Sequence, residues 1–246
     1  MKIEDSVALV TGANGGIGRA FVQELLKHGA AKIYLGARDP ASLDGLFVKS
    51  NKLVPVKLDV TKPEQIEDSA RGASDINLLI NNTGCAAYTG VLAAKDLTST
   101  RREMEVNYFG VLALTRALKD APAFHAGAAI VNVLSFIALT TIPVAGTYSA
   151  SKAAALGLTR TLRAELKPRG AQVLAAIPVQ VDTPLGVPLP EPKPKPEEVA
   201  SDTLDGLKAG EDEVSTGALS RGAAEAFRND PAGLQARMST IVHAID

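Results

Sequence analysis

The 246-residue sequence predicts an α/β protein built on one doubly wound parallel sheet. Short apolar runs of strand length alternate with helical segments from residue 7 to about residue 177. A glycine cluster follows the first run at once, where a strand would turn into a helix. Such alternation places parallel strands side by side with helices on both faces. Because no boundary resembles a domain linker and no internal repeat is present, we expect a single domain over 1–246.

Each element is assigned from its apolar spacing and its end signals. Gly29 ends the first helix, and Thr61 with Glu64 has capping-box spacing around Pro63, which favours a helix there. Pro168 and Gly170 follow the end of another. The expected strands are 7–10, 32–35, 53–58, 76–80, 129–134 and 172–177, and the expected helices are 19–28, 43–48, one beginning after Thr61, 99–118, 148–166, 197–208 and 218–242.

The composition is that of a soluble globular protein. Hydrophobic residues make up 46% of the chain and aromatic residues only 4%, so aliphatic side chains must build the core. The 26 basic and 27 acidic residues nearly balance, which disfavours a nucleic-acid or acidic-membrane partner. No apolar run approaches the ~20 residues of a membrane span, and the charged first residues do not fit a signal peptide.

The few cysteine and histidine residues bear on the compartment and on metal binding. The single cysteine, Cys85, excludes an intramolecular disulfide and fits a reducing compartment, so we expect a cytoplasmic protein. The three histidines, His28, His125 and His243, are scattered without metal-ligand spacing. No metal site is therefore expected.

Beyond Pro178 the alternation stops at a proline-rich stretch. The segment 184–196 contains six prolines, which exclude a helical interior. It could be a polyproline ligand for another domain, but an extended segment crossing within the same domain is favoured. The segments 197–208 and 218–242 then have the pattern of surface helices.

The glycine cluster has the arrangement that binds a dinucleotide pyrophosphate. Gly12, Gly16 and Gly18 lie between an apolar strand and a helix, with Asn14 and Ile17 in the same turn. Glycines let the backbone approach phosphates, and the helix N-terminus offers N–H donors and a positive dipole end. A plain glycine-rich turn is the alternative. The spacing lacks the Gly-Lys-Ser/Thr of a P-loop, so an ATPase is disfavoured.

The end of the second strand bears on the choice of cofactor. NAD sites usually place a carboxylate there, whereas NADP needs a cation for its 2′-phosphate. The sequence reads Gly36-Ala37-Arg38, and the guanidinium of Arg38 suits bidentate phosphate contact. Asp39 could instead pair with Arg38 or reach the ribose. We expect NADP(H), with NAD(H) less favoured.

A tyrosine and a lysine stand four residues apart at the start of an expected helix, in Tyr148-Ser149-Ala150-Ser151-Lys152. This spacing puts both on one helix face. A cation beside a phenol favours phenolate, so we expect Lys152 to lower the pKa of Tyr148 from ~10 toward neutrality. Such a phenol could exchange a proton with an alcohol oxygen. The same residues would also fit an ordinary helix start, with Thr147 or Ser149 as the cap.

Together these features resemble the short-chain dehydrogenase/reductases, in the single-domain branch of about 250 residues, over roughly residues 5 to 185. The matching positions are Thr11 to Gly18, Asn81 to Gly84 (a near match to Asn-Asn-Ala-Gly), Asn107, Ser135 and Tyr148-x-x-x-Lys152. The resemblance implies a Rossmann-type fold and hydride transfer with a nicotinamide cofactor, which does the redox chemistry while the protein supplies orientation and the proton.

The resemblance also implies roles for individual residues. Tyr148 would be the general acid in ketone reduction and the base in alcohol oxidation. Lys152 would tune Tyr148 and hold the nicotinamide ribose, Ser135 would bind the substrate oxygen, and Asn107 would hold a water of the proton relay. The other expected cofactor contacts are Asp59 and Val60 at the adenine, Asn81 and Gly84 along the cleft, Thr183 near the carboxamide, and Pro178 and Val181.

Two positions depart from the family pattern. Thr83 stands where the family usually has Ala, and Val179 follows Pro178 where the family usually has Gly. Gly there allows close approach to the nicotinamide, so Val179 should narrow or reshape the pocket. The proline-rich segment after Thr183 replaces the helical substrate lid of many relatives, which suggests a more open active site.

The expected substrate pocket is small and apolar. Because it holds no cation to pair with a carboxylate or phosphate, we expect a neutral, apolar ketone, aldehyde or secondary alcohol. Cys85 could be read as a nucleophile, but no histidine neighbour is evident. The expected pocket residues are Cys85, Ala86, Phe136, Leu139, Val144, Val179, Gln180 and Leu185.

Other readings remain open. A dinucleotide-sensing regulatory protein that has lost catalysis would have no need of Ser135, Tyr148 and Lys152. An epimerase or dehydratase of the extended branch would need a larger substrate domain than this chain offers. By analogy with relatives, which pair through the helices at 99–118 and 149–166, we expect a homodimer or homotetramer.

Overall fold

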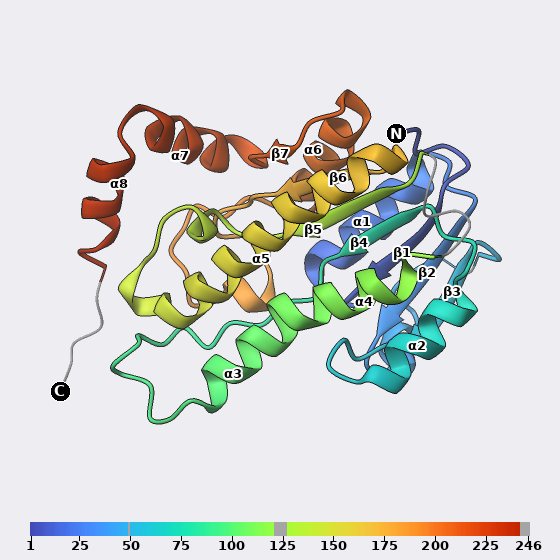
Figure 1. Cartoon of the computed structure of the whole chain (residues 1–246), viewed down its shortest axis with the longest axis horizontal. Coiled ribbons are helices and arrows are strands. Elements are labelled where there is room, and N and C mark those ends of the chain that lie inside the picture. Colours follow the sequence, from blue (N-terminus) through green and yellow to red (C-terminus); the bar gives the residue numbers. More distant parts are fainter. Residues whose placement is uncertain (49, 121–126, 242–246) are drawn as a thin grey trace.

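The computed structural model describes residues 1–48, 50–120 and 127–241. Over these ranges the chain forms one sheet of seven parallel strands, in the order β3-β2-β1-β4-β5-β6-β7, with helices on both faces (Figure 1). This is the doubly wound α/β architecture predicted from the alternation. The elements are β1 Val7–Thr11, α1 Gly16–Lys27, β2 Lys32–Ala37, β3 Leu53–Lys57, α2 Pro63–Gly72, β4 Leu78–Asn81, α3 Thr98–Met104, α4 Gly110–Leu118, β5 Ala129–Val133, α5 Gly146–Leu166, β6 Gln172–Ala176, α6 Pro196–Ala209, β7 Glu213–Val214, α7 Gly217–Asn229 and α8 Pro231–Met238.

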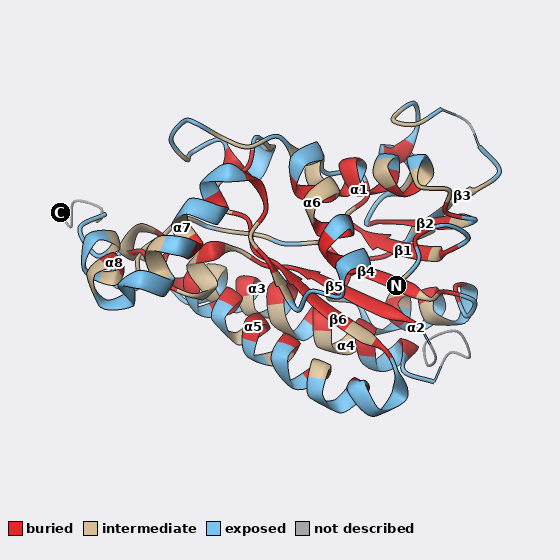
Figure 2. Ribbon diagram, turned by 90° about the horizontal axis from the view of Figure 1, so that it is seen from above, coloured by how far each residue is buried: buried red, intermediate tan, exposed pale blue. Residues whose placement is uncertain are grey.

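The sheet is buried between two layers of helices. Helices α1 and α6 cover one face, and α2, α4 and α5 cover the other (Figure 2). The central strands are continuous apolar runs because both of their faces are covered, and every residue of β4 and β5 is buried. Phe21 and Leu204 belong to the core on the first face, and Leu114 and Leu162 to the core on the second.

The order of the strands determines where the sheet leaves room for a binding site. The chain builds β2 and β3 on one side of β1, then returns to lay β4, β5 and β6 on the other side. The connections therefore diverge at the carboxyl ends of β1 and β4 and leave a crevice there. Helices α7 and α8 extend beyond the sheet toward the start of α5, at the same end (Figure 1).

Three expected helical features differ in the structure. The helix expected at 43–48 is replaced by a short 3₁₀ turn at Pro40–Leu43, capped by the Asp39 carboxylate. The expected capping box at Thr61 does not form, because the Thr61 hydroxyl donates to Asp59 at 2.7 Å, although α2 still begins at Pro63. The long helix over 99–118 is present but contains a π-helical turn at Glu105–Phe109.

The C-terminal region also differs from expectation. The single helix expected over 218–242 is divided into α7 and α8, because Asp230 leaves helical geometry and caps the next helix through the N–H of Gly233. Position 242 lies outside the described residues. The two-residue strand β7 was not expected, since so short a pair carries no periodicity.

The proline-rich stretch is extended within the fold. It makes a short 3₁₀ turn at Pro184–Gly186 and stays irregular up to Pro196, where α6 begins. The N–H of Asp182 donates to the carbonyl of Pro194 at 3.0 Å, so the stretch is a loop with closely spaced ends. No helix in the described ranges is both long and apolar enough to cross a membrane.

Candidate active site

A cavity of about 830 Å³ opens at the carboxyl ends of the central strands. Most of the residues expected at the site line it. They are Gly12, Asn14, Gly16, Ile17, Arg38, Asp59, Val60, Gly84, Cys85, Ser135, Phe136, Val144, Tyr148, Lys152, Pro178, Val179, Gln180, Val181, Thr183 and Leu185. One continuous cleft therefore joins the glycine turn to the Tyr148–Lys152 pair.

The glycine turn is built for close backbone approach. Gly12 has φ +65°, a conformation that residues with a side chain rarely adopt. A Cβ on Gly18 would lie 2.1 Å from the carbonyl oxygen of Gly12, so no side chain fits there. Helix α1 begins without a side-chain cap and without an acidic residue in its first turn. Its N-terminal N–H groups and positive dipole end thus face the cleft, as an anion site requires.

The end of the cleft near β2 and β3 carries charge of both signs. Arg38 lines it, while the Asp39 carboxylate accepts a hydrogen bond from the N–H of Ala41 at 3.1 Å and lies outside the lining. The Asp39 side chain is thus committed to the local turn. Asp59 accepts hydrogen bonds from Thr61, and although its partial burial opposes ionisation, these bonds hold its pKa below the ordinary value. An ionised carboxylate beside Arg38 is able to accept a hydrogen bond from an amino group.

The amide of Asn14 ties the glycine turn to the loop after β2. Its Nδ2 donates to the hydroxyl of Ser42 at 3.0 Å. The Ser42 hydroxyl in turn donates to the carbonyl of Asp39. The backbone around Arg38 is therefore held in a fixed position beside the glycine turn.

Tyr148 and Lys152 lie in the first two turns of α5, at the opposite end of the cleft. Both are nearly fully buried, with 7% and 4% of their surface exposed. The Lys152 Nζ donates to the carbonyl of Val133, at the end of β5, at 2.9 Å. The same atom lies 5.8 Å from the centre of the Tyr148 ring. The expected pairing on one helix face is present.

The electrostatics of this pair differ from expectation. Burial raises the pKa of Tyr148 far above its ordinary value, and burial lowers the pKa of Lys152 to about 8. Desolvation of the phenolate is the largest cause of the Tyr148 shift, while the Nζ of Lys152 donates to the carbonyl of Val133. The expectation of a lowered Tyr148 pKa is therefore wrong for this arrangement. Tyr148 holds its proton at neutral pH, the form needed to protonate an alkoxide.

Asn107 sits in the π-helical turn behind the cleft. Its Oδ1 accepts from the N–H of Cys85 at 3.0 Å, and its Nδ2 donates to the carbonyl of Cys85 and the hydroxyl of Ser151, both at 2.9 Å. A Cβ on Gly84 would lie 3.4 Å from Asn107 Oδ1 and 3.5 Å from Lys152 Nζ. The glycine thus lets both side chains come close behind the cleft.

Val179 packs away from the cleft as well as lining it. Its side chain contacts the cluster that includes Leu134, Phe136 and residues of α7. Its N–H donates to the hydroxyl of Ser220 in α7 at 2.9 Å. The apolar contacts of the Val179 side chain with α7 give a structural reason for the departure from glycine, whereas a glycine could also make the N–H contact with Ser220.

Five of the expected residues do not line the cavity. Gly18 packs under the glycine turn, and Asn107 lies behind Gly84. Asn81 is buried and donates to Asn132 at 2.8 Å, whereas the adjacent Asn82 lines the cleft and donates to the carbonyl of Thr11. The remaining two are Ala86 and Leu139, which pack in neighbouring apolar clusters.

Several lining residues carry no motif and were not expected. Tyr88 sits edge-on to Tyr148, with 6.1 Å between ring centres, and its hydroxyl donates to the carbonyl of Leu185 at 2.9 Å. The proline-rich loop therefore covers part of the cleft rather than leaving it open. The others include Arg102 of α3, Ile137 and Ile142 of the loop after β5, and Met238 and Ile241 near the C-terminus. Only tertiary contacts bring them to the site.

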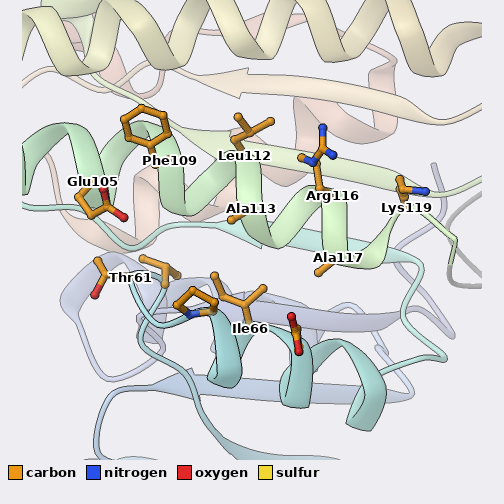
Figure 3. A pocket seen from close by; sticks show the side chains of 12 residues that line it. Thr61, Ile66, Glu105, Phe109, Leu112, Ala113, Arg116, Ala117 and Lys119 are labelled. Atoms are coloured by element: carbon orange, nitrogen blue, oxygen red, sulfur yellow. The ribbon is translucent and has the colours of Figure 1, made fainter.

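The part of the chain that the structure describes has a further hollow outside this cleft. A second hollow of about 580 Å³ lies between α2 and α4, where Ile66 and Ala113 are among the lining residues (Figure 3). Val60 borders both cavities. Within the described ranges no group of three or more His, Cys, Asp or Glu side chains could hold a metal ion. His125 and His243 lie outside those ranges.

Comparison with known proteins adds independent evidence. Residues 6–193 match the sequence profile of the family described as short chain dehydrogenase. A short chain dehydrogenase from Burkholderia cenocepacia J2315, solved in complex with NADP, is similar with 41% identity and a TM-score of 0.91, over 97% of this chain and 99% of that one.

Two further relatives differ in cofactor. The NADPH-dependent 1-acyldihydroxyacetone phosphate reductase of Saccharomyces cerevisiae is 33% identical, over 70% of this chain and 59% of the yeast protein. The 3-ketoacyl-(acyl-carrier-protein) reductase of Brucella melitensis, solved with NADH, is 26% identical with a TM-score of 0.75, over 83% of this chain and 91% of that one.

Proposed function

The chain belongs to the short-chain dehydrogenase family of oxidoreductases, and on that basis we propose that it uses NADP(H) to interconvert a neutral, largely apolar ketone or aldehyde and its alcohol. One observation carries the proposal. A single cleft has a glycine turn and a cation at one end and a buried Tyr148–Lys152 pair at the other.

The residues at the first end fit a dinucleotide. The cradle left by Gly12 and Gly18, which a Cβ would fill, matches a pyrophosphate above the N-terminus of α1. Arg38 would hold a 2′-phosphate by charge-assisted hydrogen bonds. The Asp39 carboxylate caps the local turn through Oδ1, and Asp39 is not among the residues that line the cleft. NADP(H) is accordingly favoured over NAD(H), in line with the NADP complex of the Burkholderia relative.

At the other end the side chains handle the proton. When bound, the nicotinamide supplies the hydride. Ser135, at the carboxyl end of β5, would hydrogen-bond the carbonyl oxygen and Tyr148 would donate its proton to that oxygen. Lys152 would hold the nicotinamide ribose, and Asn107 would support the proton relay behind it. Burial keeps Tyr148 protonated, the form that gives up a proton when a carbonyl is reduced.

The lining around Tyr148 favours an uncharged substrate. The charged residues among the described lining are Arg38, Asp59, Arg102 and Lys152. The positive charges of Arg102 and Arg38 both lower the pKa of Asp59, at the proposed adenosine end. The Nζ of Lys152 donates a hydrogen bond to the carbonyl of Val133. None of them is placed to pair with a charged group on the substrate. An apolar carbonyl compound is therefore the best match.

The test is an activity screen of neutral ketones and aldehydes with NADPH and with NADH. We expect NADPH consumption with at least one carbonyl compound and a lower KM for NADPH than for NADH. A protein that binds NADPH tightly yet consumes none across the panel would instead be a dinucleotide sensor. Equal or better use of NADH would overturn the cofactor assignment.

Two expectations about the protein in its setting stay predictions. We propose a cytoplasmic location, from the composition and the single cysteine, and, by analogy with relatives, a homodimer or homotetramer formed through the helical segments 99–118 (α3 to α4) and 149–166 (α5). Sedimentation analysis at micromolar concentration would show a dimer or tetramer mass. A monomer at that concentration would contradict the proposed assembly.

A further inference from the structure

Helix α8 is fixed to the loop after β5 by one glutamine. The Oε1 of Gln235 accepts from the hydroxyl of Thr140 at 2.7 Å and from the N–H of Thr141 at 2.9 Å. Its Nε2 donates to the carbonyl of Thr141 at 3.0 Å. The amide thus joins two segments that are more than ninety residues apart in the sequence.

This attachment presents an aliphatic surface beside the reactive tyrosine. Met238 and Ile241 line the cleft, together with Ile142 and Val144 from the attached loop. The N–H of Val144 donates to the carbonyl of Ile241 at 3.3 Å, which closes the contact between the two segments. Met238, Val144 and Ile142 belong to the same apolar cluster as Tyr148. The aliphatic surface therefore begins where the carbonyl group would react.

The chemistry of this surface favours a flexible alkyl chain. Aliphatic side chains and a methionine thioether offer no hydrogen bond, and methionine adapts its shape to what it contacts. Ile241 is 45% exposed, so the surface runs from Tyr148 out to the edge of the molecule. A substrate group lying along it could extend outward rather than end in a closed pocket.

We propose that α8, held by Gln235, forms one wall of a slot for an unbranched alkyl chain attached to the reacting carbonyl, so that the substrate is an alkyl ketone or aldehyde. This proposal rests on the proposed function for the reaction itself. Gln235 is a positioning residue, because it touches the loop and not the substrate. Met238 and Ile241 would contact the chain directly.

Chain length gives a graded test. With NADPH saturating, a series of methyl ketones from butanone to decanone should show KM falling about three- to fourfold per added methylene, the change expected for burying one CH₂. In Gln235→Leu, which keeps similar volume but loses the hydrogen bonds, the dependence should fall below about twofold per methylene while kcat for butanone stays within about twofold. Arg237→Ala, on the exposed side of α8, should behave as the wild type.

Met238→Ala is the second variant, in case Gln235→Leu does not fold. It removes part of the wall and should flatten the series in the same way. A KM series that is steep in the wild type and equally steep in both folded variants would overturn the slot, as would a flat series in the wild type.

A binding measurement separates this proposal from the proposed reaction. Ligand-observed NMR of the same ketones with the protein and NADP⁺ reports affinity without turnover. Affinity that rises with chain length in the wild type, and less in Met238→Ala, would support the slot even if NADPH were never consumed. Turnover with no effect of chain length on KM or affinity would support the proposed oxidoreductase activity and contradict the proposed slot.

Discussion

The two ends of the cleft are built in different ways. The cofactor end is made by backbone, from a turn of consecutive residues between β1 and α1 and from the strand ends beside it. The substrate end is made largely by side chains from segments far apart in sequence, among them the loop after β4, the loop after β5, the proline-rich loop and α8. At the first end glycine is required because any side chain would collide. At the second end each wall depends on a hydrogen bond between segments, such as Tyr88 to Leu185 or Gln235 to Thr140.

This contrast suggests how substitutions should act. A substitution in the cofactor end would clash with backbone atoms that cannot move. Its effect on dinucleotide binding should therefore be large and should not depend on the substrate. A change in the substrate end shifts a wall, so the effect should be smaller and should vary from one substrate to another.

The strongest test of the backbone end is Gly18→Ala. The new Cβ would lie 2.1 Å from the Gly12 carbonyl oxygen, and that backbone cannot move without distorting the turn. We expect NADPH affinity, measured by fluorescence titration, to fall about a hundredfold or more, with ~1–3 kcal/mol lost from the free energy of unfolding. Gly222→Ala in α7 is the control, since no described atom beyond its own stretch of helix backbone lies within 4 Å of its added Cβ, and it should leave NADPH affinity unchanged. Wild-type affinity in Gly18→Ala would show that the turn is not rigid.

The pH profile tests the buried pair where the two ends meet. The pKa of Lys152 is lowered to about 8, so it is charged below this pH and neutral above it. If the ammonium form serves reduction, kcat/KM should be flat below the pKa and fall about tenfold per pH unit above it. Lys152→Arg, which stays charged throughout, should be slower but should lose this fall. If kcat/KM of the wild type is still constant two pH units above the pKa, the charge of Lys152 is not needed for proton transfer.

Replacing Arg38 with Ala tests the charged part of the cofactor end. Loss of charge-assisted hydrogen bonds to a phosphate should raise the Kd for NADPH about tenfold to a hundredfold and leave the Kd for NADH unchanged. Arg101→Ala, an exposed arginine on α3 outside the cleft lining, is the matched control. An equal rise in the Kd for NADPH and for NADH would mean that Arg38 does not bind the 2′-phosphate.

The smallest effect is expected for Val179→Gly at the substrate end. It removes an apolar contact with α7 but keeps the backbone bond to Ser220. We expect a loss of ~1–2 kcal/mol in stability, seen as a melting temperature lower by a few degrees, and NADPH affinity within about twofold. KM should change for bulky carbonyl compounds only. A large loss of NADPH binding would place Val179 in the cofactor end instead.

The same contrast explains what could be predicted from the sequence. Local signals gave the sheet, the glycine turn, Arg38 and the Tyr148–Lys152 spacing, because each is set by a few consecutive residues or by helical periodicity. The wall residues Tyr88, Met238 and Ile241 could not be predicted, because no spacing links them to α5. The break at Asp230-Pro231 had a local signal, a capping residue before a proline, which the apolar pattern of 218–242 obscured.

Charge effects were the least predictable part. Helical spacing correctly placed Lys152 near Tyr148, but it could not show that Lys152 Nζ binds Val133 or that both side chains are buried. Burial then sets the direction of both pKa shifts. A motif therefore predicts which groups meet, and only the surrounding structure decides their protonation.

The proposal that Tyr148 donates the proton during carbonyl reduction is tested most directly by single-turnover kinetics of Tyr148→Phe with NADPH bound. Tyr108→Phe, which changes a tyrosine outside the cleft lining, is the control. We expect the hydride-transfer rate of Tyr148→Phe to fall about 10²- to 10⁴-fold with NADPH affinity unchanged, because only the proton donor is lost. A rate within a few-fold of the wild type would contradict the assignment of Tyr148 as the general acid.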